Sequence, residues 1–258
     1  MQAKNLILFV LLGLSASLFL IWRSVRKKTV KKELPQTIIV GTNAEYPPYT
    51  FIEDNQIVGF DIDIAKEVFK KIGKTFEIKD MSWTALIPAI QLGQIQVIAA
   101  GMTATPQRAK HVIFTKPYVK GDPLLIVNLA KNPTINDIDE LKDKKVIVNE
   151  GYTADIYMSN IKGPILQRLP SPTEGFLALK SERADAYVIA KSSANQFFDK
   201  HGDLAFNAVE IPDEAAGESY SLAISKKYPE LLDKIQSALD EMEKDGTIQS
   251  LKNKWNIR

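Results

Sequence analysis

The order of the predicted elements limits the fold most strongly, because the succession strand, helix, strand, helix, strand occurs twice. In the first half, apolar strands alternate with helices that carry an apolar stripe; the predicted elements are strand 37–41, helix 61–72, strand 75–81, helix 84–93 and strand 97–100. The second half repeats the order with strand 145–149, helix 153–160, strand 165–169, helix 173–181 and strand 184–189. Such alternation is typical of doubly wound α/β sheets, so we predict two α/β lobes with a cleft between them.

The remaining segments connect or cover these lobes. Three segments are expected to be extended: 111–118, 123–127 and 220–224. Two amphipathic helices are expected at the end of the chain: 229–244 and 247–255. Asp61 is expected to cap the helix that begins there, because a carboxylate at a helix start accepts hydrogen bonds from free backbone N–H groups.

Charge is distributed unevenly along the chain. The whole sequence holds 33 basic and 31 acidic residues, for a net charge of +2. Residues 1–32 contain seven of the basic residues and no acidic one, so the remainder carries 26 basic and 31 acidic side chains. Because binding to nucleic-acid phosphates requires a basic face, this acidic body argues against a nucleic-acid partner.

Residues 6–22 form an unbroken run of 17 apolar or small residues. As a helix the run would span about 26 Å, close to the thickness of a bilayer's hydrocarbon core, so we predict an export signal or a membrane anchor. Ser15-Ala16-Ser17 has the form of a cleavage site, but cleavage there would leave an apolar end at 18–22, which favours retention. The basic cluster 23–32 follows the run, and such flanks tend to stay cytoplasmic, so the orientation remains open. The chain has no cysteine, which excludes a lipid-modified cysteine as the anchor.

A candidate anion site follows the apolar strand 97–100. The side chains shrink to alanine and glycine there, and the hydroxyl of Thr103 and the guanidinium of Arg108 come next. Backbone N–H groups, a hydroxyl and a guanidinium together can hold a carboxylate, which arginine binds through two parallel hydrogen bonds. The structural alternative is a strand-to-helix turn with Pro106 at the first helical position and a solvated arginine.

Five segments match a known family in their order and spacing: 41–49, 58–65, 83–89, 100–108 and 245–248. On these segments the chain from about residue 37 to 258 resembles the solute-binding proteins of polar amino-acid ABC transporters. These are the bacterial extracellular solute-binding proteins of family 3, of the arginine-, histidine- or glutamine-binding type. The resemblance implies the periplasmic binding protein type II fold, an α/β fold of two lobes joined by two crossover segments.

The resemblance also implies how the chain is divided. Residues 1–32 would be the signal sequence or membrane anchor, 37–120 with 214–258 the first lobe, and 121–213 the second. The crossover segments near Lys120 and Asp213 would act as hinges that close on a ligand. The closed form would dock onto the membrane permease subunits of an ABC transporter, in the periplasm or another extracytoplasmic space, with any retained anchor in the inner membrane.

Ligand contacts in the first lobe follow from the same resemblance. The site for the ligand α-carboxylate matches Arg108 together with four residues before it: Ala100, Gly101, Met102 and Thr103. Tyr46 and Trp83 match the two aromatic positions that sandwich the ligand side chain, where a cationic group gains roughly 0.5–2 kcal/mol from a ring face. Asn43 and Glu45 would face the distal group of the ligand, although Glu45 could equally be a solvated residue at the rim. These positions favour arginine or another basic amino acid, with glutamine or histidine as alternatives.

Ligand contacts in the second lobe would come from the turn after strand 145–149. Thr153 matches a position that adds a hydrogen bond to the ligand, and Asn149, Glu150 and Gly151 lie beside it.

One ligand-lining position departs from the family pattern. The family places an aspartate that binds the ligand α-ammonium where this chain has Ala190. A buried ammonium without a counter-charge is costly. Either another carboxylate replaces it, from Glu150, Glu174, Glu218 or a shifted register, or the ligand lacks an α-ammonium, or the site is degenerate.

The favoured function is therefore a binding protein for a small amino acid, without enzymatic activity, cofactor or metal. The first alternative is an enzyme that resembles cyclohexadienyl dehydratases on the same fold, with Glu150, Glu174 or Lys191 as the general acid. The second is a membrane-tethered sensing module that reports a ligand to a partner protein. Metal-ligand spacings and a nucleophilic triad are not found in the sequence, which has two histidines, His111 and His201.

Overall fold

The computed structural model describes residues 33–201, 205–212 and 217–257. The chain divides into two units, Met1–Leu34 and Pro35–Arg258, and the description below concerns the second. The predicted export signal or anchor at 6–22 lies outside the described residues, as does the predicted hinge residue Asp213. Across the described ranges, no helix combines the length and apolar character needed to cross a membrane.

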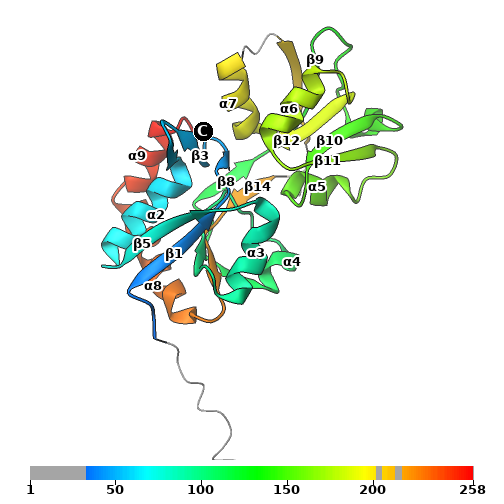
Figure 1. Cartoon of the computed structure of the whole chain (residues 1–258). Coiled ribbons are helices and arrows are strands. Elements are labelled where there is room, and N and C mark those ends of the chain that lie inside the picture. The colour runs from blue at the N-terminus through cyan, green and yellow to red at the C-terminus, as the bar shows by residue number, and fades with distance from the viewer. Residues whose placement is uncertain (1–32, 202–204, 213–216, 258) are drawn as a thin grey trace, which may run out of the picture. The chain divides into compact units, whose positions relative to one another are not determined.

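The first lobe is built on a five-stranded sheet in the order β5-β1-β6-β15-β7. Its strands are β1 (Thr37–Thr42), β5 (Thr75–Asp80), β6 (Val97–Ile98), β7 (Val112–Phe114) and β15 (Ala223–Ser225). The first three pair in parallel, whereas β15 runs antiparallel to both of its neighbours. Four longer helices belong to this lobe: α2 (Phe60–Lys71), α3 (Trp83–Leu92), α8 (Pro229–Lys244) and α9 (Thr247–Lys254) (Figure 1).

The second lobe has its own five-stranded sheet in the order β11-β10-β12-β9-β13. Its strands are β9 (Leu124–Leu129), β10 (Lys145–Asn149), β11 (Ile165–Leu169), β12 (Ala186–Ala190) and β13 (Phe206–Glu210). Its helices are η1 (Ile138–Leu141), α5 (Thr153–Met158), α6 (Pro172–Lys180) and α7 (Lys191–His201). Along β10, Val146 and Val148 pack into one apolar cluster and Ile147 into another, because successive side chains of a strand point to opposite faces. The strand is therefore buried on both faces.

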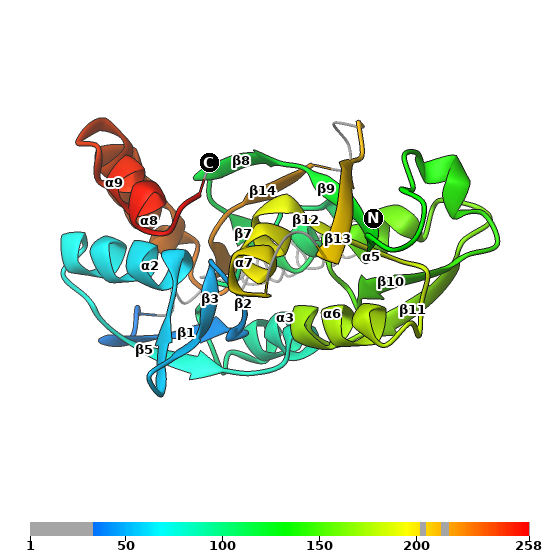
Figure 2. The same cartoon turned by 90° about the horizontal axis from the view of Figure 1, so that it is seen from above.

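A two-stranded antiparallel ribbon connects the lobes. It consists of β8 (Val119–Asp122), which leads from β7 to β9, and β14 (Glu218–Tyr220), which leads from β13 towards β15. Both views show this ribbon between the two sheets (Figures 1 and 2). The predicted single strand 220–224 is in fact two strands, because the chain leaves the ribbon at Ser221 and joins the first sheet at Ala223.

A three-stranded sheet was missed by the sequence prediction. It contains β2 (Glu45–Tyr46), β3 (Thr50–Glu53) and β4 (Gln56–Val58). Asp54 and Asn55 form its two-residue turn with φ values of +48° and +59°. Such left-handed values are typical of tight hairpin turns, and aspartate and asparagine tolerate them better than most residues.

The predicted capping role of Asp61 is wrong. Gly59 is the N-cap of α2, no side chain caps the helix, and Asp61 lies within its first turn. The carboxylate of Asp61 instead accepts the backbone N–H of Gly101 at 2.6 Å, which joins α2 to the turn after β6. Burial raises the pKa of Asp61 to about 7, although hydrogen bonds to the carboxylate oppose the rise.

Candidate ligand-binding site

Arg108 is buried at the interlobe cleft. It lies on the short helix α4 (Pro106–Ala109), where the Thr105 hydroxyl caps the helix by accepting the Arg108 N–H at 3.2 Å. The Arg108 side chain is only 6% exposed, and burial lowers its pKa to about 10, so the guanidinium stays charged at neutral pH. Nη1 donates to the Thr103 carbonyl at 2.7 Å and Nη2 to the Gly151 carbonyl at 2.9 Å. The guanidinium therefore contacts both lobes, unlike the solvated arginine of the structural alternative.

The turn before α4 differs from the prediction in its hydrogen bonding. Gly101 has φ +59°, and a Cβ there would lie 2.8 Å from the Tyr46 ring, so the close approach of ring and backbone requires glycine. The Gly101 N–H, which was predicted to face the ligand, is taken by Asp61. The Thr103 hydroxyl accepts the N–H of Ser219 at 3.2 Å. The Gly101 amide is therefore engaged within the protein, and the Thr103 hydroxyl retains its own hydrogen to donate.

The two predicted aromatic residues both contact a third, Tyr152, which sequence reasoning missed. Tyr46 meets the Tyr152 ring edge-on with centroids 5.4 Å apart, and Trp83 lies tilted against it at 4.6 Å. Trp83 Nε1 also donates to the Gly151 carbonyl at 3.0 Å, and the Arg108 guanidinium lies 5.0 Å from the centre of the Trp83 ring. The only sequence signal for Tyr152 was an aromatic residue beside the glycine of the turn.

Asn43 and Glu45 differ in their positions. Asn43 is 3% exposed, and its Oδ1 accepts the Tyr152 hydroxyl at 3.0 Å. Its Nδ2 donates to the Met81 carbonyl at 3.3 Å and approaches Glu45 Oε2 at 3.4 Å. Glu45 itself is exposed, so its carboxylate lies at the rim and Asn43 lies in the interior.

The turn after β10 brings the second lobe to the cleft, but its residues have different roles. Glu150 is exposed, whereas Thr153 begins α5 and is 9% exposed. Asn149 is buried within the second lobe, where its side chain accepts the Tyr187 hydroxyl and donates to the Leu169 carbonyl at 3.3 Å. The Asn149 side chain is therefore engaged within the second lobe, and its contact with a ligand stays a prediction.

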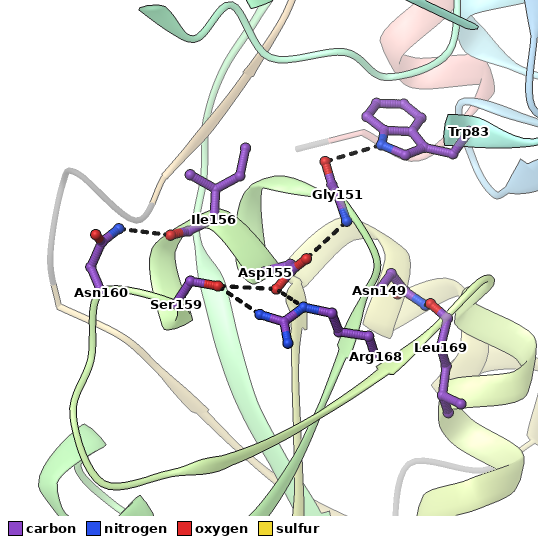
Figure 3. A network of polar contacts seen from close by, with 9 residues as sticks. All are labelled: Trp83, Asn149, Gly151, Asp155, Ile156, Ser159, Asn160, Arg168 and Leu169. Atoms are coloured by element: carbon purple, nitrogen blue, oxygen red, sulfur yellow. Dashed lines mark hydrogen bonds and ion pairs between the residues drawn. The ribbon is translucent and has the colours of Figure 1, made fainter. Parts of the chain in front are cut away.

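Asp155 fixes the Gly151 turn from below (Figure 3). Its Oδ2 accepts the Gly151 N–H at 2.9 Å. Its Oδ1 accepts the Arg168 Nε–H at 2.9 Å and the Ser159 hydroxyl at 3.2 Å, and Arg168 Nη2 donates to Ser159 at 2.9 Å. The Asp155 carboxylate is buried, and two of its three donors, Arg168 and Ser159, are also hydrogen-bonded to each other. This network holds the Gly151 turn in place.

Of the three glutamates considered as replacements at Ala190, only Glu218 is buried. Ala190 ends β12 and is 2% exposed, so no carboxylate reaches the cleft from this position. Glu150 and Glu174 are exposed, whereas Glu218 is 4% exposed on the ribbon strand β14. Directly opposite it in the ribbon register is Asp122, 8% exposed, which sequence reasoning missed.

Hydroxyl groups surround this pair of carboxylates. Asp122 accepts Ser192 Oγ–H at 2.5 Å, the Ser192 N–H at 3.0 Å and the Tyr220 hydroxyl at 2.9 Å. Glu218 accepts the Tyr46 hydroxyl at 3.4 Å. Burial raises the pKa of Glu218 to about 7, with Asp122 adding to the rise and Arg108 opposing it, and burial also raises the pKa of Asp122. None of the ion pairs found among the described residues involves either carboxylate.

Two cavities border these groups. One of ≈ 270 Å³ lies beside Arg108 and is lined also by Trp83, Met102 and Gly151. The other, of ≈ 560 Å³, lies at Asp122 and is lined also by residues of α7 and by Asn256. Ala100 and Met102 are each 1% exposed, so their side chains are buried beneath the turn, and the Met102 carbonyl accepts the Ser221 N–H at 3.0 Å.

Residues 38–257 match the model of the bacterial extracellular solute-binding proteins, family 3. The chain belongs to this family. It is therefore a solute-binding protein with the type II periplasmic binding protein fold, as the resemblance implied, and its place is extracytoplasmic.

Relatives of known name agree with this assignment. The chain is 35% identical over 230 residues to the arginine-binding extracellular protein ArtP of Bacillus subtilis (strain 168). This match covers 84% of this chain and 85% of ArtP. It is 31% identical over 222 residues to a probable histidine-binding protein of Campylobacter jejuni, with 86% and 85% covered.

Solved structures agree as well. An ancestral arginine-binding protein bound to arginine matches with a TM-score of 0.80 and 38% identity, over 86% of this chain and 99% of that one. An ancestral arginine-binding protein bound to glutamine also matches with a TM-score of 0.80 and 38% identity, over 86% of this chain and 99% of that one. These similar proteins bind solutes, so the solute-binding protein is favoured over the dehydratase-like enzyme.

Proposed function

We propose that this solute-binding protein binds arginine, or an amino acid of similar shape and charge, between its lobes and delivers it to the permease of an ABC transporter. The observation that carries the proposal is the buried Arg108 guanidinium, which lies beside an aromatic wall at the meeting point of both lobes. A guanidinium in such a place can bind a ligand carboxylate through two hydrogen bonds. ArtP and the ancestral protein bound to arginine support arginine, and glutamine is the second candidate because an ancestral arginine-binding protein is also known with glutamine bound.

Glu218 and Asp122 supply the negative charge for the ligand's ammonium in this proposal. Both are buried on the ribbon, and the charges of Glu218 and Arg108 are close enough to shift each other's pKa. An α-amino acid carries its carboxylate and ammonium on one carbon, so an arginine and a carboxylate close together suit it. The ribbon would thus replace the carboxylate that Ala190 lacks.

The lobes are proposed to comprise 37–120 with 214–258, and 121–213, with the hinges near Lys120 and Asp213. Closure around the ligand then depends on the ligand's higher affinity for the closed state.

We also propose that the apolar run 6–22 keeps the protein at the membrane. Membrane fractionation would detect this tether, and recovery of a soluble protein shortened at its amino terminus would contradict it.

The proposed ligand can be tested with the full chain in mild detergent. Arginine at one hundred times its dissociation constant is expected to stabilise the folded state by about 2.7 kcal/mol, because it binds only the folded protein. The measurement is a thermal melt with arginine, lysine, glutamine, histidine, prephenate and simple carboxylates as separate probes. Stabilisation by prephenate or a simple carboxylate, but by no amino acid, would contradict the proposal.

Arginine affinity is expected to fall as the pH is lowered from 7.5 to 5.5. A cationic ligand favours the ionised form of Glu218, whose pKa is raised to about 7, so binding below this pH requires loss of a proton. The groups that face Glu218 are Asp122, Tyr46, Tyr220 and Arg108. Calorimetry in buffers of different ionisation enthalpy should show proton release that Glu218→Gln reduces. Release of the same size in both proteins would exclude Glu218 as the group that titrates.

A further inference from the structure

The tip of the second lobe, Gly151 with Tyr152, lies among the residues that the first lobe offers to a ligand. The Gly151 carbonyl accepts hydrogen bonds from Arg108 Nη2 at 2.9 Å and from Trp83 Nε1 at 3.0 Å. A carbonyl oxygen is a hydrogen-bond acceptor, as a ligand carboxylate is. This oxygen therefore uses a donor that the proposed ligand needs.

The Tyr152 side chain extends this correspondence. It is 6% exposed, and its ring contacts both Tyr46 and Trp83, with centroid distances of 5.4 and 4.6 Å. Its hydroxyl, at the far end of the ring, donates to Asn43 Oδ1 at 3.0 Å. Each part of the tip thus occupies a place predicted for a part of the ligand. The Gly151 carbonyl lies at the carboxylate-binding Arg108, and the Tyr152 ring lies at the aromatic residues predicted to hold the ligand side chain. The Tyr152 hydroxyl lies at Asn43, which was predicted to face the distal group.

The tip is also held in place for these contacts. Asp155 accepts the Gly151 N–H and is itself fixed by Arg168 and Ser159 (Figure 3). A group that is already ordered loses little conformational entropy when it makes a contact. The tip is therefore an effective competitor for Arg108 and the aromatic residues.

We propose that the Gly151 carbonyl and the Tyr152 side chain form an internal competitor, which an amino acid must displace from Arg108, Trp83 and Tyr46 in order to bind. The inference rests on the proposed function. It makes Tyr152 a specificity-determining residue, because a ligand is accepted only when its own contacts replace those of the tip. Apparent affinity is proportional to the fraction of molecules whose site is free of the tip, so the competitor weakens binding by occupying the site.

Removal of the ring tests the competitor. In the full chain, Tyr152→Ala is expected to bind arginine about tenfold more tightly than the wild type in calorimetry, because less of the protein has its site blocked. Tyr152→Phe, which removes only the hydrogen bond to Asn43, should gain less. Ile165→Ala, at a residue 57% exposed on the same lobe, is the control and should match the wild type. Affinity of Tyr152→Ala equal to or weaker than the wild type would overturn the proposal.

A second measurement needs no ligand. X-ray scattering of the protein alone should give a larger radius of gyration for Tyr152→Ala than for the wild type, because the contacts of the ring with the first lobe are lost. Equal radii would overturn the competitor whatever the binding data show. A larger radius with no amino acid bound by any variant would support the competitor and contradict the proposed function. Tyr152→Thr serves both measurements if the alanine variant melts below the assay temperature.

Discussion

Replacing Arg108 with alanine is expected to weaken arginine binding by about 10²- to 10³-fold, because a buried charged partner of the ligand carboxylate is removed. The residue is 6% exposed, so water does not readily take the place of its guanidinium. Arg108→Lys keeps the charge but loses the planar pair of donors, and an intermediate loss is expected. Calorimetry at constant pH and salt measures both variants.

The control for this prediction is Lys110→Ala. Lys110 is an exposed cation two residues further along the chain, so its loss changes the net charge equally without changing the cleft. Its variant should bind arginine like the wild type. Arg108 also donates to two carbonyl groups, so each variant needs a melting curve to establish that it is folded at the temperature of the titration. A folded Arg108→Ala with wild-type affinity would exclude Arg108 as the carboxylate-binding group.

Gly59→Ala is expected to destabilise the protein by about 3–5 kcal/mol, since backbone strain and overpacking coincide at one residue. Gly59 has φ +131°, and a Cβ there would lie 2.3 Å from the Tyr49 carbonyl oxygen and 2.8 Å from the Thr50 nitrogen. Backbone hydrogen bonds immediately after it, from Phe60 to Pro48 and from Asp61 to Tyr49, hold the two segments together at 3.0 Å each. The clash therefore involves two tied backbone segments and cannot be relieved by rotating a side chain.

Gly73→Ala provides the matched comparison. Gly73 has φ +65°, but a Cβ there would meet no heavy atom within 4 Å, so only the cost of the left-handed backbone remains, about 1 kcal/mol. For a domain of this size, the melting temperature of Gly59→Ala should fall by about 10 °C and that of Gly73→Ala by a few degrees. Equal shifts for the two variants would show that the contact with Tyr49 and Thr50 is unimportant.

Strand and helix positions were predicted best where the sequence pattern is local. The strands at 145–149 and 165–169 and the helix at 229–244 have the predicted bounds. The hairpin at β3 and β4 was missed because its strands are short and lie near Pro47 and Pro48, although Asp54-Asn55 was a readable turn signal. The antiparallel pairing of β13 with β9 depends on residues some 80 positions apart, which no local pattern records.

The site was predicted only where local motifs mark its residues. Arg108, Tyr46 and Trp83 do lie together, and the sequence identified them through such motifs. Asp122 was missed because its importance depends on its cross-strand register with Glu218, which is 96 residues away in sequence. Hydrogen bonds made by the Gly101 amide and the Asn149 side chain were also unpredictable, since their partners, Asp61 and Tyr187, come from separate elements.

The position of β15 has a consequence for the biosynthesis of the protein. This strand lies between β6 and β7 in the first sheet, yet it follows all the strands of the second sheet in the chain. During translation the second sheet is complete while β7 still lacks its only sheet neighbour among the described strands. A nascent chain that ends before Ala223 would therefore have an intact second lobe and an open first sheet, and the amino-terminal lobe would be the last to assemble.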